Sequence, residues 1–201
     1  QRYLVGAFHK WLGENSIHDD LSLYSLSWLI GGKKNNKGLE FKHGAQWMIS
    51  AHDLTLLKQL VQNIQQDPII NFGMEVRSLT ICEEPNFSSN KERFHLASPV
   101  FIKRNVESKI QYYYYFDQEA DELMTITLQN KLKKAGISEM GVKVSFDKTY
   151  LNPKTKCISY NGIVCKASMC PVVVEGTPEQ IAFAWNVGIG NSTGIGFGAL
   201  R

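Results

Sequence analysis

The sequence lacks any hydrophobic run of the roughly 18–20 residues that a membrane-spanning helix needs. It also lacks a basic and then apolar leader at its start. We therefore expect a cytoplasmic protein that makes no contact with a membrane. The first residue is Gln1 and not methionine, which leaves open that the chain is part of a longer, fused polypeptide.

Cysteine is scarce and not paired in the way that structural zinc sites require. The four cysteines contain no C-x-x-C pair, and they are Cys82, Cys157, Cys165 and Cys170. In a chain without a secretory signal, such residues are typical of reduced thiols rather than disulfides. We expect neither a structural metal nor a cofactor.

Nucleotide-binding loops are missing as well, although glycine is concentrated near the end. Residues 186–201 read NVGIGNSTGIGFGALR, with no G-K-[ST] triplet. Dinucleotide and triphosphate loops need a strand before the glycines and a helix after them, whereas here a helix precedes and a short strand follows. Such glycines can bring backbone N–H groups close to a phosphate chain, or they can form a tight hairpin packed against a helix. Both interpretations stay open.

Positive charge is unevenly distributed along the 201 residues. The chain carries a net charge of +3, and residues 98–201 account for all of it. Residues 131–166 alone hold eight lysines against only Glu139 and Asp147. Such a patch can attract a polyanion by releasing its counterions, or it can be a solvated surface that keeps the protein soluble. Charge alone does not decide between the two.

The hydrophobic periodicity predicts alternating helices and strands. We expect helices over residues 3–12, 53–64, 117–135 and 177–187. We expect strands over residues 21–30, 39–50, 69–82, 99–103, 110–116, 142–146, 156–174 and 197–200, with a basic hairpin tip at 31–38. Read in order, these elements predict an α+β fold of two tandem ferredoxin-like modules, residues 1–97 and 98–201. The first module lacks its opening strand.

The end of the chain carries a resemblance to a known family. The residues Phe183, Trp185 and Asn186 followed by glycines at 188, 190, 194, 196 and 198 are similar to the C-terminal signature of the CRISPR repeat-processing endoribonucleases of the RAMP superfamily. The stretches 97–100, 112–117 and 23–27 resemble other segments of that family in the same order. The resemblance implies a tandem ferredoxin-like fold that binds CRISPR repeat RNA and cuts it once, without a metal.

Metal-free RNA cleavage needs a base that activates the 2′-hydroxyl, an acid that protonates the leaving 5′-oxygen, and a group that stabilises the phosphorane. In the family a histidine just after the first helix is usually catalytic, and His18 occupies that position. His9 is its expected partner, and Tyr24 is a weaker candidate. The family's lysine after the histidine is missing, so a lysine of the hairpin tip or Lys10 is expected to supply the cation. The expected RNA contacts are Gly188, Gly190, Asn191, Ser192, Thr193, Gly194, Gly196, Lys131, Lys133, Lys134, Lys33 and Lys34.

Two alternatives remain at this point. The pairs His18-Asp19 and His52-Asp53 resemble those of metal-dependent phosphohydrolases, but that fold is all-helical, whereas strands are expected here. The other alternative is a non-catalytic RAMP subunit that holds RNA inside a CRISPR effector complex. A partnership with effector subunits and a homodimer are both left open.

Overall fold

The structure is a computed structural model of the chain that describes residues 1–13, 21–36, 38–160 and 162–201. The helices of the described part are α1 (Arg2–Leu12), α2 (Leu54–Gln66), α3 (Ala120–Lys134), α4 (Pro178–Val187) and the short 3₁₀ helix η2 (Thr193–Ile195). Its strands are β1 (Tyr24–Leu26), β2 (Lys33–Asn35), β3 (Gly38–Glu40), β4 (Ile49–Ala51), β5 (Lys91–Phe94), β6 (Ile102–Val106), β7 (Lys109–Tyr113), β8 (Lys143–Phe146), β9 (Lys154–Tyr160), β10 (Ile163–Met169) and β11 (Val172–Glu175). Across the described ranges, no helix combines the length and apolar character needed to cross a membrane.

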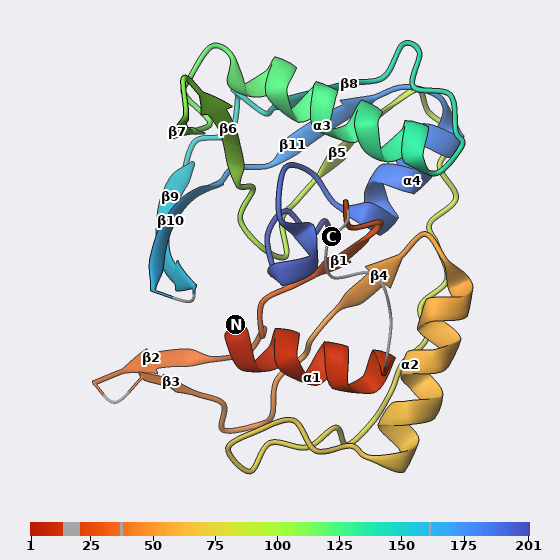
Figure 1. Cartoon of the computed structure of the whole chain (residues 1–201), viewed down its shortest axis with the longest axis vertical. Coiled ribbons are helices and arrows are strands. Elements are labelled where there is room, and N and C mark those ends of the chain that lie inside the picture. Colours follow the sequence, from red (N-terminus) through yellow and green to blue (C-terminus); the bar gives the residue numbers. More distant parts are fainter. Residues whose placement is uncertain (14–20, 37, 161) are drawn as a thin grey trace.

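A three-stranded antiparallel sheet, in the order β5-β11-β8, lies in the half of the molecule drawn at the top of Figure 1. Helices α3 and α4 pack against it and share one hydrophobic core with it. Val174 from β11, Leu128 from α3 and Ile181 from α4 are each buried in that core. Burying each such side chain contributes about 1.5–3 kcal/mol, so the apolar stripes of the helices hold this layer together.

A second hydrophobic core lies in the half drawn at the bottom of Figure 1, where α1 and α2 pack on the antiparallel pair β1–β4. Helix α2 begins after Asp53, whose carboxylate accepts a hydrogen bond from the Thr55 amide at 2.7 Å. The side chains of Asn63 and Gln59 donate to the carbonyls of Trp11 and Leu12. These two carbonyls lie at the end of α1, where a helix leaves acceptors without partners.

The glycine-rich loop, which we define as residues 188–198, lies between these two layers (Figure 1). The loop closes on itself because the Ile189 amide donates to Gly198 O at 2.9 Å, and Gly198 in turn donates to Pro99 O at 2.8 Å. A Cβ on Gly190 would lie 2.7 Å from Phe101 O, and the φ of this residue is +81°. Glycine at this position therefore permits a close backbone approach that other residues would prevent.

Most expected elements are present, but several expected strands are shorter or missing. The mixed helices and antiparallel sheets confirm the α+β class. Residues 69–82 form no strand apart from the isolated bridge between Ile69 and Glu75. The expected strand over 156–174 is divided into β9, β10 and β11, and the expected final strand over 197–200 reduces to a single bridge between Leu96 and Leu200. The division into modules at residue 97 stays a prediction.

Candidate functional site

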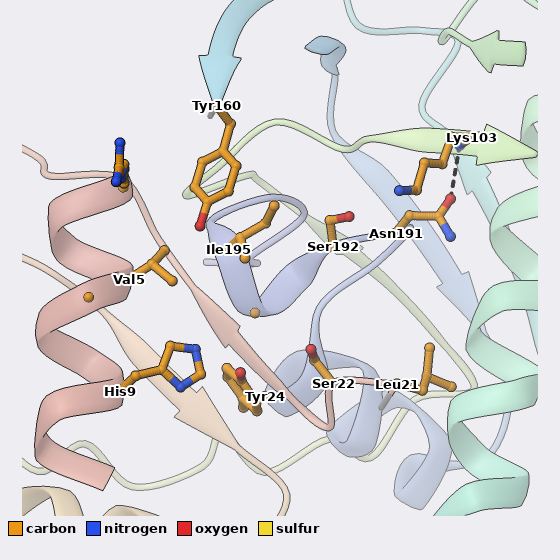
Figure 2. Close-up of a pocket in the computed structure, with 13 residues that line it drawn as sticks. Val5, His9, Leu21, Ser22, Tyr24, Lys103, Tyr160, Asn191, Ser192 and Ile195 are labelled. Atoms are coloured by element: carbon orange, nitrogen blue, oxygen red, sulfur yellow. Dashed lines mark hydrogen bonds between the residues drawn. The ribbon is translucent and has the colours of Figure 1, made fainter. Parts of the chain in front are cut away.

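A pocket of about 630 Å³ opens where α1, the start of β1 and the glycine-rich loop meet. It gathers residues that are far apart in the sequence (Figure 2). Its lining is formed by Arg2, Val5, Gly6, His9, Leu21, Ser22, Tyr24, Lys103, Tyr160, Asn191, Ser192, Gly194 and Ile195. Five of the residues expected from the sequence are among them, namely His9, Tyr24, Asn191, Ser192 and Gly194.

Tyr24 forms one wall of the pocket from the first residue of β1. Its ring stacks on Phe8 of α1 with the ring centroids 4.8 Å apart, and only 4% of the residue is exposed. Burial raises the pKa of the Tyr24 phenol above its ordinary value, and a hydrogen bond from Ser22 opposes that shift. The phenol is therefore protonated at neutral pH and suited to donate a hydrogen bond rather than to accept a proton.

His9 lines the same pocket from α1, where it is half-buried. Its imidazole meets Phe8 edge-on, with the ring centroids 5.4 Å apart. Figure 2 shows the ring projecting from α1 toward the side where Tyr24 and Ser22 lie. Because an imidazole changes its protonation near neutral pH, this placement suits proton transfer. His18 falls within residues 14–20 and lies outside the described residues, three positions before Leu21 of the pocket lining.

Two cationic residues also line the pocket, and the sequence pattern gave no sign of either. Lys103 lies on β6, and its backbone amide donates to Asn191 Oδ1 at 2.9 Å (Figure 2). Arg2 begins α1 and lies close enough to Tyr160 for its charge to oppose the rise in pKa that burial imposes on the Tyr160 phenol. Lys103 thus joins β6 to the glycine-rich loop, and Arg2 joins the first turn of α1 to the end of β9, so no local motif could have revealed either.

Lys10, which the sequence offered as an alternative cation, is bonded to residues outside the pocket. Its ammonium group bonds to the carboxylate of Asp67 at 2.9 Å and to the carbonyl of Ile69. Lys33 lies on β2 and does not line the pocket, and the side chain of Lys34 lies outside the described part. Lys133 pairs with Glu139 at 3.2 Å, whereas Lys134 donates to Leu21 O at 2.8 Å beside the pocket.

Lys131 is the clearest correction to the sequence expectation of a surface that contacts RNA. Only 1% of this residue is exposed, and its Nζ is hydrogen-bonded inside the protein. A buried side chain cannot contact a ligand at the surface without leaving these partners. The signal was present in α3, because Lys131 shares the helical spacing of the buried residues Met124, Leu128 and Leu132.

Close packing explains why several positions of the glycine-rich loop are glycine. Gly188, Gly190 and Gly196 are buried and have positive φ angles, and a Cβ on Gly188 would lie 2.7 Å from Gly198 O. Thr193 is also buried, and its hydroxyl donates to Tyr24 O at 2.9 Å. Asn191 and Ser192 are half-buried and line the pocket, so they are the polar side chains of the loop that a ligand can reach.

The described residues around the pocket bring no cluster of metal-binding side chains together. Over the described ranges, no group of three or more histidine, cysteine, aspartate or glutamate residues is arranged to hold an ion. The described lining of the pocket offers imidazole, hydroxyl and cationic groups for chemistry. That the reaction proceeds without a metal stays a prediction.

Solved structures of low sequence identity share the fold. A structure described as a Cas6-related gene product from Pyrococcus furiosus matches with a TM-score of 0.82 and 15% identity, covering 100% of this chain and 88% of that one. A RAMP protein described as binding different RNA substrates matches with a TM-score of 0.80 and 15% identity, over 100% and 90% of the two chains. A Cas6 product complex matches with a TM-score of 0.65 and 13% identity, over 100% and 93%. These similarities confirm the tandem ferredoxin-like fold.

A search of curated proteins found no match to the sequence. The family model described as CRISPR associated protein Cas6, C-terminal, matches residues 82–201, which is more than half of the chain and includes the whole glycine-rich loop. The resemblance seen in the sequence is thereby confirmed, and this chain belongs to the Cas6 family of CRISPR-associated proteins.

Proposed function

We propose that the protein is an endoribonuclease that cuts CRISPR precursor RNA within its repeats, without a metal ion. Membership of the Cas6 family supports a role in CRISPR RNA processing. In the proposed reaction the 2′-hydroxyl of one nucleotide attacks the adjacent phosphorus as the bond to the 5′-oxygen breaks. The products are a 2′,3′-cyclic phosphate and a 5′-hydroxyl, and one proton is removed as another is supplied.

The observation that carries this proposal is the composition of the pocket of about 630 Å³. The reaction needs a group that transfers protons, and His9 lines the pocket. It also needs donors or cations for the charged phosphorane, and Tyr24, Lys103 and Arg2 line the same space. In this scheme Lys103 or Arg2 takes the part of the lysine that the sequence lacks after His18.

His18 stays the first candidate for the general base or acid, with His9 as its partner. His18 precedes the pocket residue Leu21 by three positions in the sequence. The phenol of Tyr24, which burial keeps protonated, acts as a hydrogen-bond donor. Asn191, Ser192 and Gly194 contact the RNA near the cut, while Lys33, Lys34, Lys133 and Lys134 contribute positive charge along its path.

The test is cleavage of the CRISPR repeat RNA from the source genome in excess EDTA, followed by identification of the product ends. We expect one cut that leaves a 2′,3′-cyclic phosphate and a 5′-hydroxyl. An RNA with a single 2′-deoxynucleotide at the cut site is the matched control, and it should bind but stay intact. Tight binding of the all-RNA repeat without any cut would contradict the proposal and indicate a non-catalytic RAMP subunit.

A further inference from the structure

Lys131 is a buried lysine in the last turn of α3 whose partners are all oxygens of the chain's C-terminal segment. Its Nζ lies 2.9 Å from Val187 O, 3.2 Å from Gly188 O and 2.9 Å from Thr193 Oγ1. In its protonated form a lysine has three N–H donors, and these three acceptors use all of them. The bonds span from the end of α4 to η2 and fix both flanks of residues 189–192.

Two of these acceptors are carbonyls at the C-terminal end of α4. A helix leaves its last carbonyls without intrahelical partners and concentrates negative partial charge there. The last turn of α4 contains no basic residue of its own. Lys131 therefore supplies from a neighbouring helix the positive group that the end of α4 lacks.

The third acceptor, the Thr193 hydroxyl, is itself hydrogen-bonded to β1. Thr193 Oγ1 accepts from Lys131 Nζ and donates to Tyr24 O at 2.9 Å. Tyr24 is the pocket residue whose ring stacks on Phe8 of α1. A continuous chain of hydrogen bonds thus runs from α3 through the glycine-rich loop to the strand that carries one wall of the pocket.

Burying the charged form of Lys131 costs free energy, because the ammonium group loses its contacts with water. An isolated charge taken out of water is strongly unfavourable unless hydrogen bonds satisfy it. Burial lowers the pKa of Lys131 to about 7.

Arg104 makes a second link between α3 and the glycine-rich loop, since it donates to Asn191 Oδ1 at 3.2 Å and to Thr127 Oγ1 of α3 at 2.8 Å.

We infer that Lys131 is a positioning residue that holds the glycine-rich loop against β1 and so sets the pocket wall formed by Ser192 and Gly194. It does not touch the RNA and acts through Thr193 and the end of α4. The consequence for cleavage rests on the proposed function, whereas the consequence for the loop does not. Loss of the Nζ donors releases the loop, and the pocket then loses the geometry that the reaction needs.

The first test replaces the lysine by a residue of similar length without donors, Lys131→Met. Amide hydrogen exchange of RNA-free protein should show exchange about tenfold faster or more in peptides covering residues 188–198. Single-turnover cleavage should slow by roughly 10- to 100-fold, because a displacement on the order of 1 Å near reacting groups has effects of that size. RNA affinity should stay within about threefold, because phosphate contacts elsewhere dominate binding.

The matched control is Leu128→Ala, which shortens a buried side chain on the same face of α3 and leaves the hydrogen bonds of Lys131 to Val187, Gly188 and Thr193 in place. It should lower the unfolding temperature but leave the exchange of residues 188–198 and the cleavage rate at wild-type values, when both are measured well below that temperature. If Leu128→Ala accelerates loop exchange as much as Lys131→Met does, the effect is general destabilisation and the inference is wrong.

The second test approaches the same hydrogen bonds from the loop. Thr193→Val removes the hydroxyl and keeps the shape, while Thr193→Ser keeps the hydroxyl and should behave as wild type. The double variant Lys131→Met/Thr193→Val should be no slower in cleavage, and no faster in loop exchange, than the more affected single variant, because residues of one network are non-additive. Additive effects would overturn the inference. Should the wild type not cleave RNA, the exchange measurements alone decide the matter, so failure of the proposed function stays distinguishable.

Discussion

The hydroxyls of Tyr24 and Ser22 meet the glycine-rich loop at Gly194, where no side chain separates them from the loop backbone. A Cβ at this position would lie 2.6 Å from Ser22 Oγ and 2.8 Å from Tyr24 Oη. Tyr24 is held by its stack on Phe8, so its hydroxyl has little freedom to move aside. Gly194 therefore fixes how closely the loop approaches the polar groups of the pocket.

Gly194→Ala should accordingly reduce cleavage without unfolding the protein. Because the Tyr24 hydroxyl has little freedom to move, the added methyl group displaces the Ser22 hydroxyl and the loop backbone instead, and we expect a decrease of about tenfold or more in the single-turnover rate. Thermal unfolding should shift by only a few degrees, which corresponds to about 1 kcal/mol for a chain of this size. Cleavage at the wild-type rate would show that the approach of the loop to these hydroxyls has no role in the reaction.

The buried Lys131 predicts a particular dependence of stability on pH. Its pKa is lowered to about 7 in the folded protein, from an ordinary value of 10.5. Between these two values the unfolded chain binds more protons than the folded protein, so this residue makes the free energy of unfolding rise with pH across that window.

Urea unfolding at intervals from pH 6 to pH 10 measures this contribution. The difference in unfolding free energy between wild type and Lys131→Met should change in favour of the wild type as the pH rises from about 7. Parallel curves for the two proteins over the whole window would contradict a lowered pKa for Lys131 in the folded protein.

At the scale of elements, α4 matters because it delivers the chain into the glycine-rich loop. The helix begins with a capping box in which the Thr177 side chain accepts from the Gln180 amide at 3.3 Å and Gln180 Oε1 accepts from the Thr177 amide at 2.9 Å. Pro178 suits the first helical position because its missing N–H would have no partner there. Its other end is held by Lys131.

Removing the Thr177 hydroxyl that caps α4 should lower the stability of the protein and leave the cleavage rate unchanged. Thr177→Ala should lower the free energy of unfolding by about 1 kcal/mol, and Thr177→Ser should restore most of it. Denaturant titration measures both variants, and the cleavage rate in native conditions should be unchanged. A large loss of cleavage by Thr177→Ala, with Thr177→Ser at the wild-type rate, would mean that the start of α4 also shapes the pocket.

The helices could be predicted from the sequence because their signals are local. The apolar stripe of α1, the Asp53 cap of α2 and the Thr177-Pro178 start of α4 each lie within a few residues of the element that they define. The strand expected over residues 69–82 is wrong because a strand needs a partner for its backbone groups. Apolar residues there, such as Ile69 and Ile81, are 52% and 82% exposed.

The sequence could predict only those pocket residues whose position along the chain matches the order of segments in the family. His9 is expected from its place on the first helix and Tyr24 from its place on the strand that follows the next loop, and both line the pocket. Lys103 and Tyr160 were missed because they reach the pocket from distant strands. Lys131 was misassigned because the run of lysines that follows it suggested a charged surface, although its helical spacing places it on the buried face.

At the scale of the whole molecule, the pocket lies where the glycine-rich loop joins two hydrophobic cores. One core is built on α1, α2 and the β1–β4 pair, and the other on the β5-β11-β8 sheet with α3 and α4 (Figure 1). The pocket draws His9 and Tyr24 from the first and its loop residues from the end of the second. The geometry of the pocket therefore depends on how the loop is fixed between the cores.

The charge distribution predicts that RNA binding weakens steeply as salt rises. Each phosphate contact with single-stranded RNA contributes about −0.7 to the slope of log affinity against log salt concentration, so a few contacts cost more than tenfold between 50 and 200 mM salt. Lys33→Met should make this slope less steep, by about 0.7. The control is Lys58→Met on the exposed side of α2, which should leave the slope unchanged. Fluorescence anisotropy measures both, and a salt-independent affinity would contradict phosphate-dominated binding.

The central claim is that RNA is cut in the pocket formed by α1, β1 and the glycine-rich loop. The most direct measurement is the single-turnover cleavage rate of repeat RNA by His9→Ala and His18→Ala, with RNA affinity measured in parallel. The control is His43→Ala, because His43 is exposed and does not line the pocket. We predict that His9→Ala and His18→Ala each slow cleavage by about 100-fold or more with affinity retained, as expected for loss of proton transfer, while His43→Ala cuts normally. Wild-type rates for both the His9 and the His18 variant would place the reaction elsewhere on the protein and contradict this account.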